Sequence, residues 1–422
     1  MFTTSGFALA DLGTLQRVLA AWLIGGGVAV CGALSYGALA QRITLSGGEY
    51  VFLSRAVHPV AGFLAGWVSL LAGFTGAIAF AATAFEVYVI PDNIRPVWLP
   101  ADSIAIALVV LCGLAHGLRK QSGTVSHNIV VVLKLVLLVA FLGYAASTLP
   151  SGAWQGMQPS AAPIVPPFSV SAFALTLMWV SLSYSGFNAA VYVAGEARDA
   201  ATNVPRAMLT ATVLVMVLYL ALNAVFVYAP APESIVGQQD IAARAAAALG
   251  GSWLETGVRT IIALALLSSV SAMVLTGPRV YAQMAHDGVL PRVLRMHGDM
   301  PRTAVALQVG MACVLIRLAG LQELLSYLGF ILSISAAATV ASLFVLHPTE
   351  RRHTPKPSSR PAPMPGYPFV PAVFIVCTLG FAGLAAVRRP LEPLIGLATI
   401  AVGLVLYAVF TRGGGQRQQD QA

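Results

Sequence analysis

Long apolar segments follow one another along almost the whole chain and leave no room for a soluble domain. A helix needs roughly 20 mostly apolar residues to cross a bilayer. Eleven segments come near or pass that length: 18–40, 61–90, 101–118, 128–149, 170–194, 207–229, 252–277, 303–320, 324–347, 369–387 and 391–411. The sequence therefore predicts an all-α polytopic membrane protein whose first partner is the lipid bilayer.

The charged residues support this prediction and suggest an orientation. Only 9% of the 422 residues are charged, against about 25% in ordinary soluble domains. If residues 41–55 face the cytoplasm and sides alternate from there, 16 of 23 lysines and arginines fall on the cytoplasmic side when Lys134, which lies inside a segment, is left out. Such an excess is typical of cytoplasmic loops. The net charge of +8 is thus mainly a topology signal, and we expect no nucleic-acid partner.

The residues that carry most catalytic chemistry are scattered. The cysteines lie singly in different apolar segments, without metal-ligand spacing, at Cys31, Cys112, Cys313 and Cys377. No paired acids and no Ser/His pair stand out inside the segments. We therefore expect neither an enzyme nor a bound metal or cofactor.

One apolar segment is interrupted by polar and flexible residues at its centre. Residues 181–188 read Ser-Leu-Ser-Tyr-Ser-Gly-Phe-Asn. Hydroxyl and amide groups need partners in the membrane, and glycine loosens a helix. Transporters use interrupted helices to expose backbone groups near the bilayer midplane. The alternative is an intact helix that packs closely through small residues.

Short motifs at the segment ends, spread over roughly residues 1–345, resemble one family. The motifs are Gly32-Ala-Leu-Ser-Tyr-Gly-Ala-Leu-Ala, Ser46-Gly-Gly-Glu-Tyr-Val-Phe-Leu, Ala61-Gly-Phe-Leu-Ala-Gly-Trp, Ser185-Gly-Phe-Asn, Ala194-Gly-Glu-Ala-Arg-Asp, Asn203-Val-Pro-Arg-Ala and Gly277-Pro-Arg-Val-Tyr-Ala-Gln-Met-Ala-His-Asp-Gly-Val-Leu-Pro. Together they resemble amino acid permeases of the amino acid–polyamine–organocation (APC) superfamily, and in particular bacterial members similar to the L-type amino acid transporters.

The resemblance implies a fold of twelve helices, the first ten in a five-plus-five inverted repeat followed by two extra C-terminal helices. The eleven segments would then be helices two to twelve, and residues 1–9 the outer half of an incomplete first helix. The family's Gly-Ser/Thr-Gly-Ile-Phe motif would lie just upstream, so we expect an N-terminally truncated sequence. The expected units are a transporter core (1–347), a Pro-rich basic cytoplasmic linker (348–368), two helices (369–411) and a disordered tail (412–422).

The resemblance also assigns a substrate site at the two interrupted helices. Backbone carbonyls of the sixth helix would accept bonds from a substrate ammonium group, and the first helix would line the other side. The residues implied are Ser183, Tyr184, Ser185, Gly186, Phe187, Asn188, Thr3, Thr4 and Ser5.

Lys134 lies inside an apolar segment, where a charge is costly and a functional candidate. It matches a lysine that resembles a fixed substitute for sodium in sodium-independent members, with Ser268, Ser269 and Ser271 as expected oxygen partners. The alternatives are a lysine that reaches the membrane surface and serines that only pack.

Acidic residues near the segment ends are candidate gates. We expect Glu196 to pair with Arg206 or Arg279, or with Arg198, when the cytoplasmic side closes. Glu49 is also expected at a cytoplasmic helix end, and Glu86 near an outer one. The alternative for each is a solvated loop charge.

The resulting hypothesis is a secondary transporter, or permease, that moves amino acids or related amines by alternating access. Sodium-independent exchange, as an antiporter, and proton-coupled uptake both remain open. The expected location is a bacterial inner (plasma) membrane, with any partner subunit unknown. The alternative function is a non-transporting paralogue or substrate sensor that keeps the scaffold but lacks the first-helix motif.

Overall fold

The computed structural model describes residues 1–91, 94–118, 124–149, 154–157, 167–296, 301–353 and 364–419, and this part of the chain is helical without strands. The longer elements are α1 (Thr4–Leu12), α2 (Leu15–Arg42), α3 (Gly48–Ala56), α4 (Pro59–Val68), η1 (Ser69–Gly76), α5 (Ala77–Val89), α6 (Ser103–Leu118), α7 (Thr124–Ser147), α8 (Val170–Ser183), η5 (Ser185–Glu196), α9 (Ala200–Tyr228), α10 (Ile241–His286), α11 (Arg302–Leu318), α12 (Leu321–His353), α13 (Phe369–Arg388) and α14 (Leu391–Gln419). Single 3₁₀ turns occupy η4 (Gln155–Met157), η6 (Pro232–Ser234) and η7 (Arg292–Leu294).

The all-α polytopic architecture predicted from the sequence is confirmed. Within the described residues, 8 helices are long and apolar enough to cross a membrane. The other three expected spans are shorter. Apolar stretches at Ser103–Gly117 and Val131–Ser147 represent two of them, and the third, α11, has 17 residues and an arginine in its last turn.

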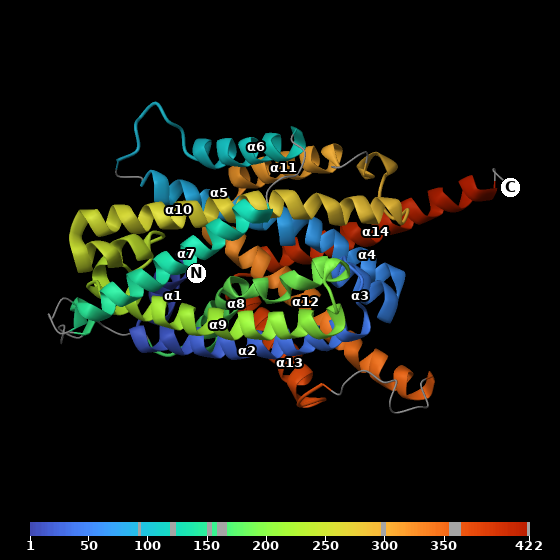
Figure 1. Cartoon of the computed structure of the whole chain (residues 1–422), viewed down its shortest axis with the longest axis horizontal. Coiled ribbons are helices and arrows are strands. Elements are labelled where there is room, and N and C mark those ends of the chain that lie inside the picture. Colours follow the sequence, from blue (N-terminus) through green and yellow to red (C-terminus); the bar gives the residue numbers. More distant parts are fainter. Residues whose placement is uncertain are drawn as a thin grey trace.

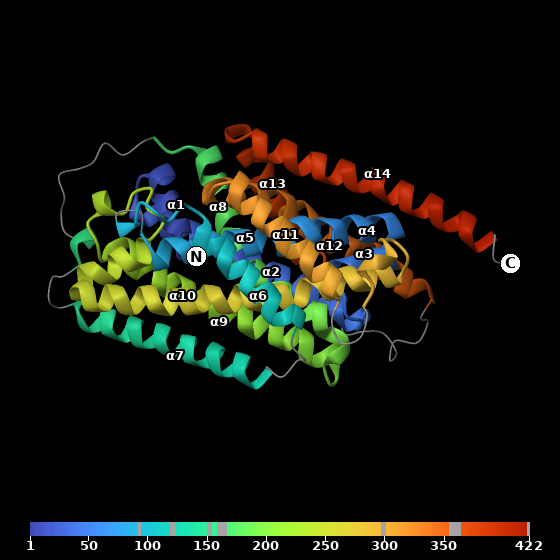
Figure 2. The same ribbon diagram turned by 90° about the horizontal axis from the view of Figure 1, so that it is seen from above.

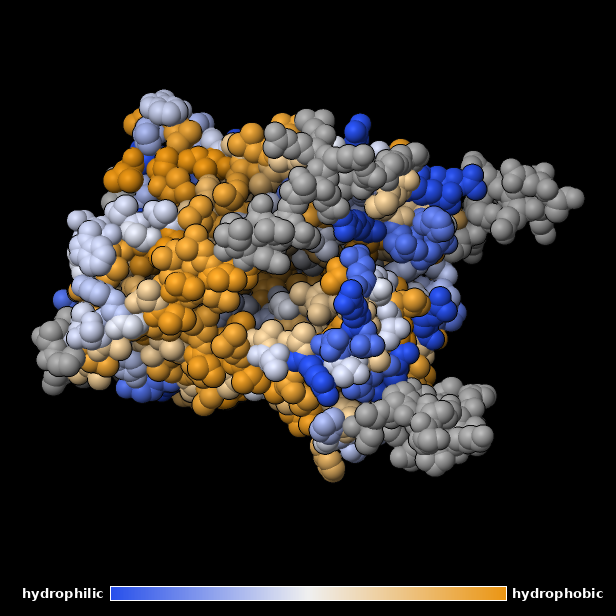
Figure 3. Space-filling model, viewed as in Figure 1, coloured by the Kyte–Doolittle hydropathy of each residue, from blue (hydrophilic) through white to orange (hydrophobic). Residues whose placement is uncertain are grey.

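Long helices run side by side along the molecule. Figure 1 shows α2, α9 and α10 extending nearly parallel, and Figure 2 shows α1 and α8 to one side of these three helices. Figure 2 shows α7 and α14 on opposite edges. In Figure 3, hydrophobic side chains form a broad band, and hydrophilic ones gather toward the end that holds α3 and α4. This distribution is that of a bundle within a bilayer.

The turn between α1 and α2 follows from two residues with local roles. Gly13 ends α1 with φ 72°, a left-handed conformation that glycine adopts without strain. Thr14 caps the start of α2, where its side chain accepts a hydrogen bond from the backbone N–H of Arg17. The chain therefore reverses within two residues and places α1 beside α2.

Several helices depart from the expected boundaries. The π-helical η1 joins α4 to α5 in one continuous rod. α12 continues to His353 and α14 to Gln419, beyond the expected ends at 347 and 411. The expected linker and tail are therefore partly helical, while residues 354–363 and 420–422 lie outside the described part.

Candidate functional site

The rod formed by α8 and η5 changes from α- to 3₁₀-helix at Tyr184. α8 ends at Ser183, Tyr184 caps it, and η5 continues as 3₁₀-helix to Glu196. The change falls inside the polar stretch in which the sequence predicted an interruption. Serine competes for backbone hydrogen bonds and glycine adds freedom, so this stretch holds an α-helix weakly. A mid-helix 3₁₀ stretch often marks a functional hinge.

A cavity of about 330 Å³ lies beside the break. Its size matches the smaller end of ligand pockets, about 300–1,000 Å³. Residues of the break and of α9 line it: Ser183, Tyr184, Gly186, Phe187, Ala189, Ala190, Ala207, Met208, Ala211, Thr212, Val215 and Tyr219. Four of the six break residues predicted from the sequence therefore face one hollow.

The start of α1 reaches the break. Thr4 Oγ1 lies 3.3 Å from Ser183 Oγ in a hydrogen bond, and the Met1 nitrogen donates to the same Oγ at 3.1 Å. Thr3 is buried at the same end. Ser5 instead donates to Asn223 Oδ1 of α9 at 2.5 Å. Thr4 thus belongs to the site, and Ser5 anchors α1 to its neighbour.

Two helix ends of opposite polarity meet at this contact. Thr4 is the first residue of α1 and Ser183 the last of α8. The N-terminus of a helix carries partial positive charge and free N–H groups, and the C-terminus carries partial negative charge and free carbonyls. Such a junction is complementary to a small molecule that has both a carboxylate and an ammonium group.

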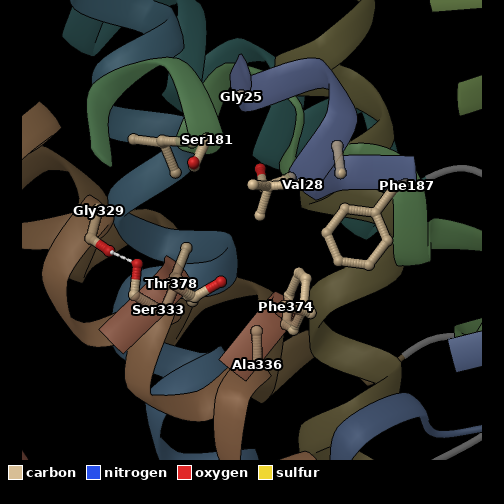
Figure 4. Close-up of a pocket in the computed structure, with 13 residues that line it drawn as sticks. Gly25, Val28, Ser181, Phe187, Gly329, Ser333, Ala336, Phe374 and Thr378 are labelled. Carbon is tan, nitrogen blue, oxygen red and sulfur yellow. Dashed lines mark hydrogen bonds between the residues drawn. The ribbon is translucent and has the colours of Figure 1, made fainter. Parts of the chain in front are cut away.

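A second hollow of about 50 Å³ also borders the break and shares Phe187 with the first. Figure 4 shows Ser181 and Phe187 facing Ser333, Phe374 and Thr378 across it, and Ser185 also lines it. Ser333 donates to the Gly329 carbonyl at 2.6 Å. The buried Ser181 Oγ has no hydrogen-bond partner in the described part of the chain. Ser185 therefore faces away from the larger cavity.

Asn188 contacts Glu49, which lies at a helix end as expected, in the first turn of α3. Asn188 Nδ2 donates to Glu49 Oε1 at 3.2 Å. Glu49 is only 4% exposed, so the alternative of a solvated loop charge is wrong for it. The Ser46-Gly-Gly-Glu motif was the available signal for this position.

Glu86 is also buried, at 2% exposure, and the solvated-charge alternative is wrong for it too. It accepts from Arg95 at 2.6 Å and from the backbone N–H groups of Asp102 and Ala105, both at 2.8 Å. Glu86 therefore fixes the beginning of α6.

Lys134 and its three expected serine partners are not brought together. Ser268 and Ser269 both donate to the Ala265 carbonyl of their own helix. Ser271 bonds His116 of α6 at 2.7 Å. Lys134 is half-buried on α7 and forms no hydrogen bond or ion pair within the described residues. Its coupling role stays a prediction.

The expected gate residues are also apart in this conformation. Glu196 and Arg206 are exposed, and Glu196 forms no ion pair with Arg198, Arg206 or Arg279 among the described residues. Arg279 is half-buried, and its Nε lacks a partner there. The described ranges also hold no group of three or more side chains suited to a metal.

Comparisons with known proteins identify a family and several similar sequences. A family model described as amino acid permease matches residues 1–410. The Homo sapiens protein "Asc-type amino acid transporter 1" is 26% identical over 357 residues, covering 82% of this chain and 67% of its own length. "Large neutral amino acids transporter small subunit 2" from Homo sapiens is 25% identical, with 96% and 76% covered. "b(0,+)-type amino acid transporter 1" from Mus musculus is 24% identical, with 97% and 84% covered.

Proposed function

We propose, from the premise that this chain belongs to the amino acid permease family, that it carries α-amino acids across a membrane through the break at Tyr184. Transport of amino acids is the function of its family and of its named relatives. The observation that carries the proposal is the junction of α1 and α8 at Thr4 and Ser183, beside a cavity of about 330 Å³.

The two charged ends of an amino acid fit the two helix ends. The carbonyls at the end of α8, around Ser183, accept bonds from the ammonium group. The N–H groups of the first turn of α1, from Thr4, donate to the carboxylate. Both interactions use main-chain groups that every α-amino acid matches, so recognition of the zwitterion does not depend on the substrate side chain. Thr212 and Tyr219 on the α9 side of the cavity then contact the side chain.

Alternating access follows if α1 and the α8–η5 rod move against the other helices. The APC fold provides this as a five-plus-five inverted repeat in which one bundle rocks against a scaffold. The 3₁₀ segment after Tyr184 is the weak point at which the inner half of the rod bends separately. The chain is then a permease of a cell membrane, and we place it in a bacterial inner membrane.

Independence from sodium is the second part of the proposal. Lys134 supplies a fixed positive charge where other transporters bind a cation, so that the chain exchanges amino acids or couples uptake to protons. For this role α7 must bring Lys134 toward α1 and α10 in another step of the cycle, because the lysine has no such partner in the described part of this conformation.

Reconstitution tests the function. Purified protein in liposomes preloaded with unlabelled amino acids is expected to take up labelled amino acid, equally with or without sodium. Ser183→Ala should weaken uptake. Thr210→Ala, which removes an exposed hydroxyl bonded within α9, should not. Absence of exchange for every amino acid and amine tried, with and without a pH gradient, refutes transport.

The same preparation distinguishes the alternative, a scaffold that senses substrate without moving it. A sensor would show substrate-dependent protection against thermal unfolding but no flux in the liposomes. Amino acid flux that Ser183→Ala weakens excludes the sensor.

A further inference from the structure

The segment Ser46–Glu49, which comprises the end of the loop after α2 and the first two residues of α3, holds η5 at several points. Ser46 Oγ accepts a hydrogen bond from the Gly195 N–H at 3.0 Å. Gly48 lies against the Tyr192 ring so closely that a Cβ at position 48 would come within 2.4 Å of it. Gly48 also has φ 60°, which favours glycine. We call this segment the η5 clamp.

Glu49 completes the clamp and ties it to the rest of the bundle. Its Oε1 accepts from Tyr36 of α2 at 2.5 Å and from Asn188 of η5 at 3.2 Å. Its Oε2 accepts from Ser335 of α12 at 2.5 Å. One carboxylate therefore joins η5 to two other helices, and Asn188 belongs to the break itself.

No cation balances this buried charge within the described part of the chain. The titratable side chains beside Glu49 are the phenols of Tyr36 and Tyr192. Other charged or titratable groups on α3 and on the segments beside it are Arg55 of α3 itself, Arg42 at the end of α2, His58 before α4, Glu196 at the end of η5 and Asp287 after α10. Asp287 accepts a hydrogen bond from Tyr50 of α3. None of these makes a hydrogen bond or ion pair with Glu49. A carboxylate buried without a cation is costly, even when hydrogen-bonded.

The free-energy cost of burying the Glu49 carboxylate determines how the closed clamp responds to pH. Burial raises the pKa of Glu49 above its ordinary value of 4.5, and the bonds from Ser335, Tyr36 and Asn188 offset part of that rise. If η5 leaves the clamp, water reaches the carboxylate and its pKa returns toward the ordinary value. Closing therefore takes up a proton. Closure is favoured at pH values below the ordinary pKa and loses that advantage as pH rises through the raised one.

We propose that the η5 clamp is a pH-responsive latch on the inner half of the transport helix, held by protonated Glu49 and released as the cytoplasm becomes more alkaline. The latch lies at the end of the molecule where hydrophilic side chains gather (Figure 3) and where the basic residues place the cytoplasm. The inference rests on the transport function proposed above, because release of η5 opens the break toward that side. It assigns Glu49 as a positioning residue that acts through Asn188.

Hydrogen exchange measured by mass spectrometry tests the latch on the purified full chain, without requiring transport. Exchange rates are measured in peptides covering residues 185–196 between pH 5.5 and 8.5. The readout is the exchange rate of the wild type divided by that of Glu49→Gln at the same pH. The ratio removes the intrinsic pH dependence of exchange. Between the ordinary pKa of Glu49 and its raised pKa in the closed clamp, this ratio of rates should rise with pH, by up to about tenfold per pH unit. Glu233→Gln, which changes an exposed carboxylate in η6, outside the clamp and η5, should match wild type.

Parallel profiles for wild type and Glu49→Gln would overturn the latch. Ser335→Ala provides a second test if Glu49→Gln does not fold. Loss of that donor removes a bond that lowers the pKa of Glu49, so exchange in wild type and Ser335→Ala should diverge, with the rise beginning at higher pH in the variant. An unchanged midpoint overturns the proposal as well.

The two proposals fail separately. If exchange depends on Glu49 as described but liposomes show no amino acid flux, the clamp stands and transport fails. If flux occurs with a pH-independent clamp, only the latch is refuted.

Discussion

Gly6 lets α1 touch the backbone of the loop that follows α9. The Gly237 N–H donates to the Gly6 carbonyl at 2.9 Å. A Cβ at position 6 would lie 2.0 Å from the Gln238 carbonyl oxygen, whereas ordinary contacts begin at 3.4 Å. Gly6→Ala must therefore separate α1 from this loop by about 1.4 Å. The opposing atom belongs to the backbone, so no side-chain rotation relieves the clash.

The expected cost follows from two opposing effects. Overpacking of this kind costs about 1–3 kcal/mol, while alanine in place of a helical glycine gains roughly 0.5–1 kcal/mol. The net result is a destabilisation of up to about 2.5 kcal/mol. The shift also moves Thr4 away from Ser183, so amino acid uptake should fall together with stability.

Thermal unfolding of the detergent-solubilised protein, followed by tryptophan fluorescence, measures the effect. Gly27→Ala is the matched control, because a Cβ there meets nothing within 4 Å. It should be neutral or slightly stabilising. A Gly6→Ala protein that melts with the wild type and transports normally would refute the close contact.

Three further predictions address other parts of the molecule. Lys134→Ala should abolish uptake in liposomes while leaving the melting curve intact, and wild-type rates would remove this lysine from the mechanism. Gly48→Ala should destabilise the fold by about 1–3 kcal/mol and raise proteolysis within 185–196, which limited digestion would detect; an unchanged digest would contradict the ring contact. Burial raises the pKa of Asp240, but hydrogen bonds from Arg244 and Arg259 outweigh this effect and hold the pKa below its ordinary value of 3.8. The ionised Asp240 therefore stabilises the fold above pH 3.8, and this stabilisation is lost as the pH falls through the lowered pKa. Asp240→Asn should cost about 3 kcal/mol near neutral pH, with the difference from wild type shrinking in acid melts; a constant difference at all pH values would contradict this account.

The features predictable from the sequence were those that depend on local composition. The lengths of the apolar segments predicted a bundle of membrane-spanning helices, because backbone polar groups in lipid must be satisfied within a helix or a closed barrel. The break at Tyr184 was predictable because serine and glycine weaken an α-helix wherever they cluster. The family motifs then indicated which helices meet at the site.

Long-range packing limited the rest. Glu49 follows two glycines at the start of a short helix and looks like a surface charge, yet α2, η5 and α12 converge on it. The α12 partner, Ser335, is 286 residues away in the chain. Nothing in the local sequence encodes that distance. The separation of Lys134 from the serines of α10 could not be predicted from the sequence either, because it depends on where α7 packs in the bundle.

The π-helical turns of η1 determine where the continuous helix formed by α4, η1 and α5 tolerates the loss of a residue. A π-helical stretch holds about one residue more than an α-helix over the same rotation. Removing one residue from Ser69–Gly76 would convert it toward ordinary α-helix with little rotation of α5. The same deletion within α5 would turn everything beyond it by about 100° and carry Glu86 away from the first turn of α6. Natural one-residue deletions in this rod should therefore be found inside η1 and not beyond it.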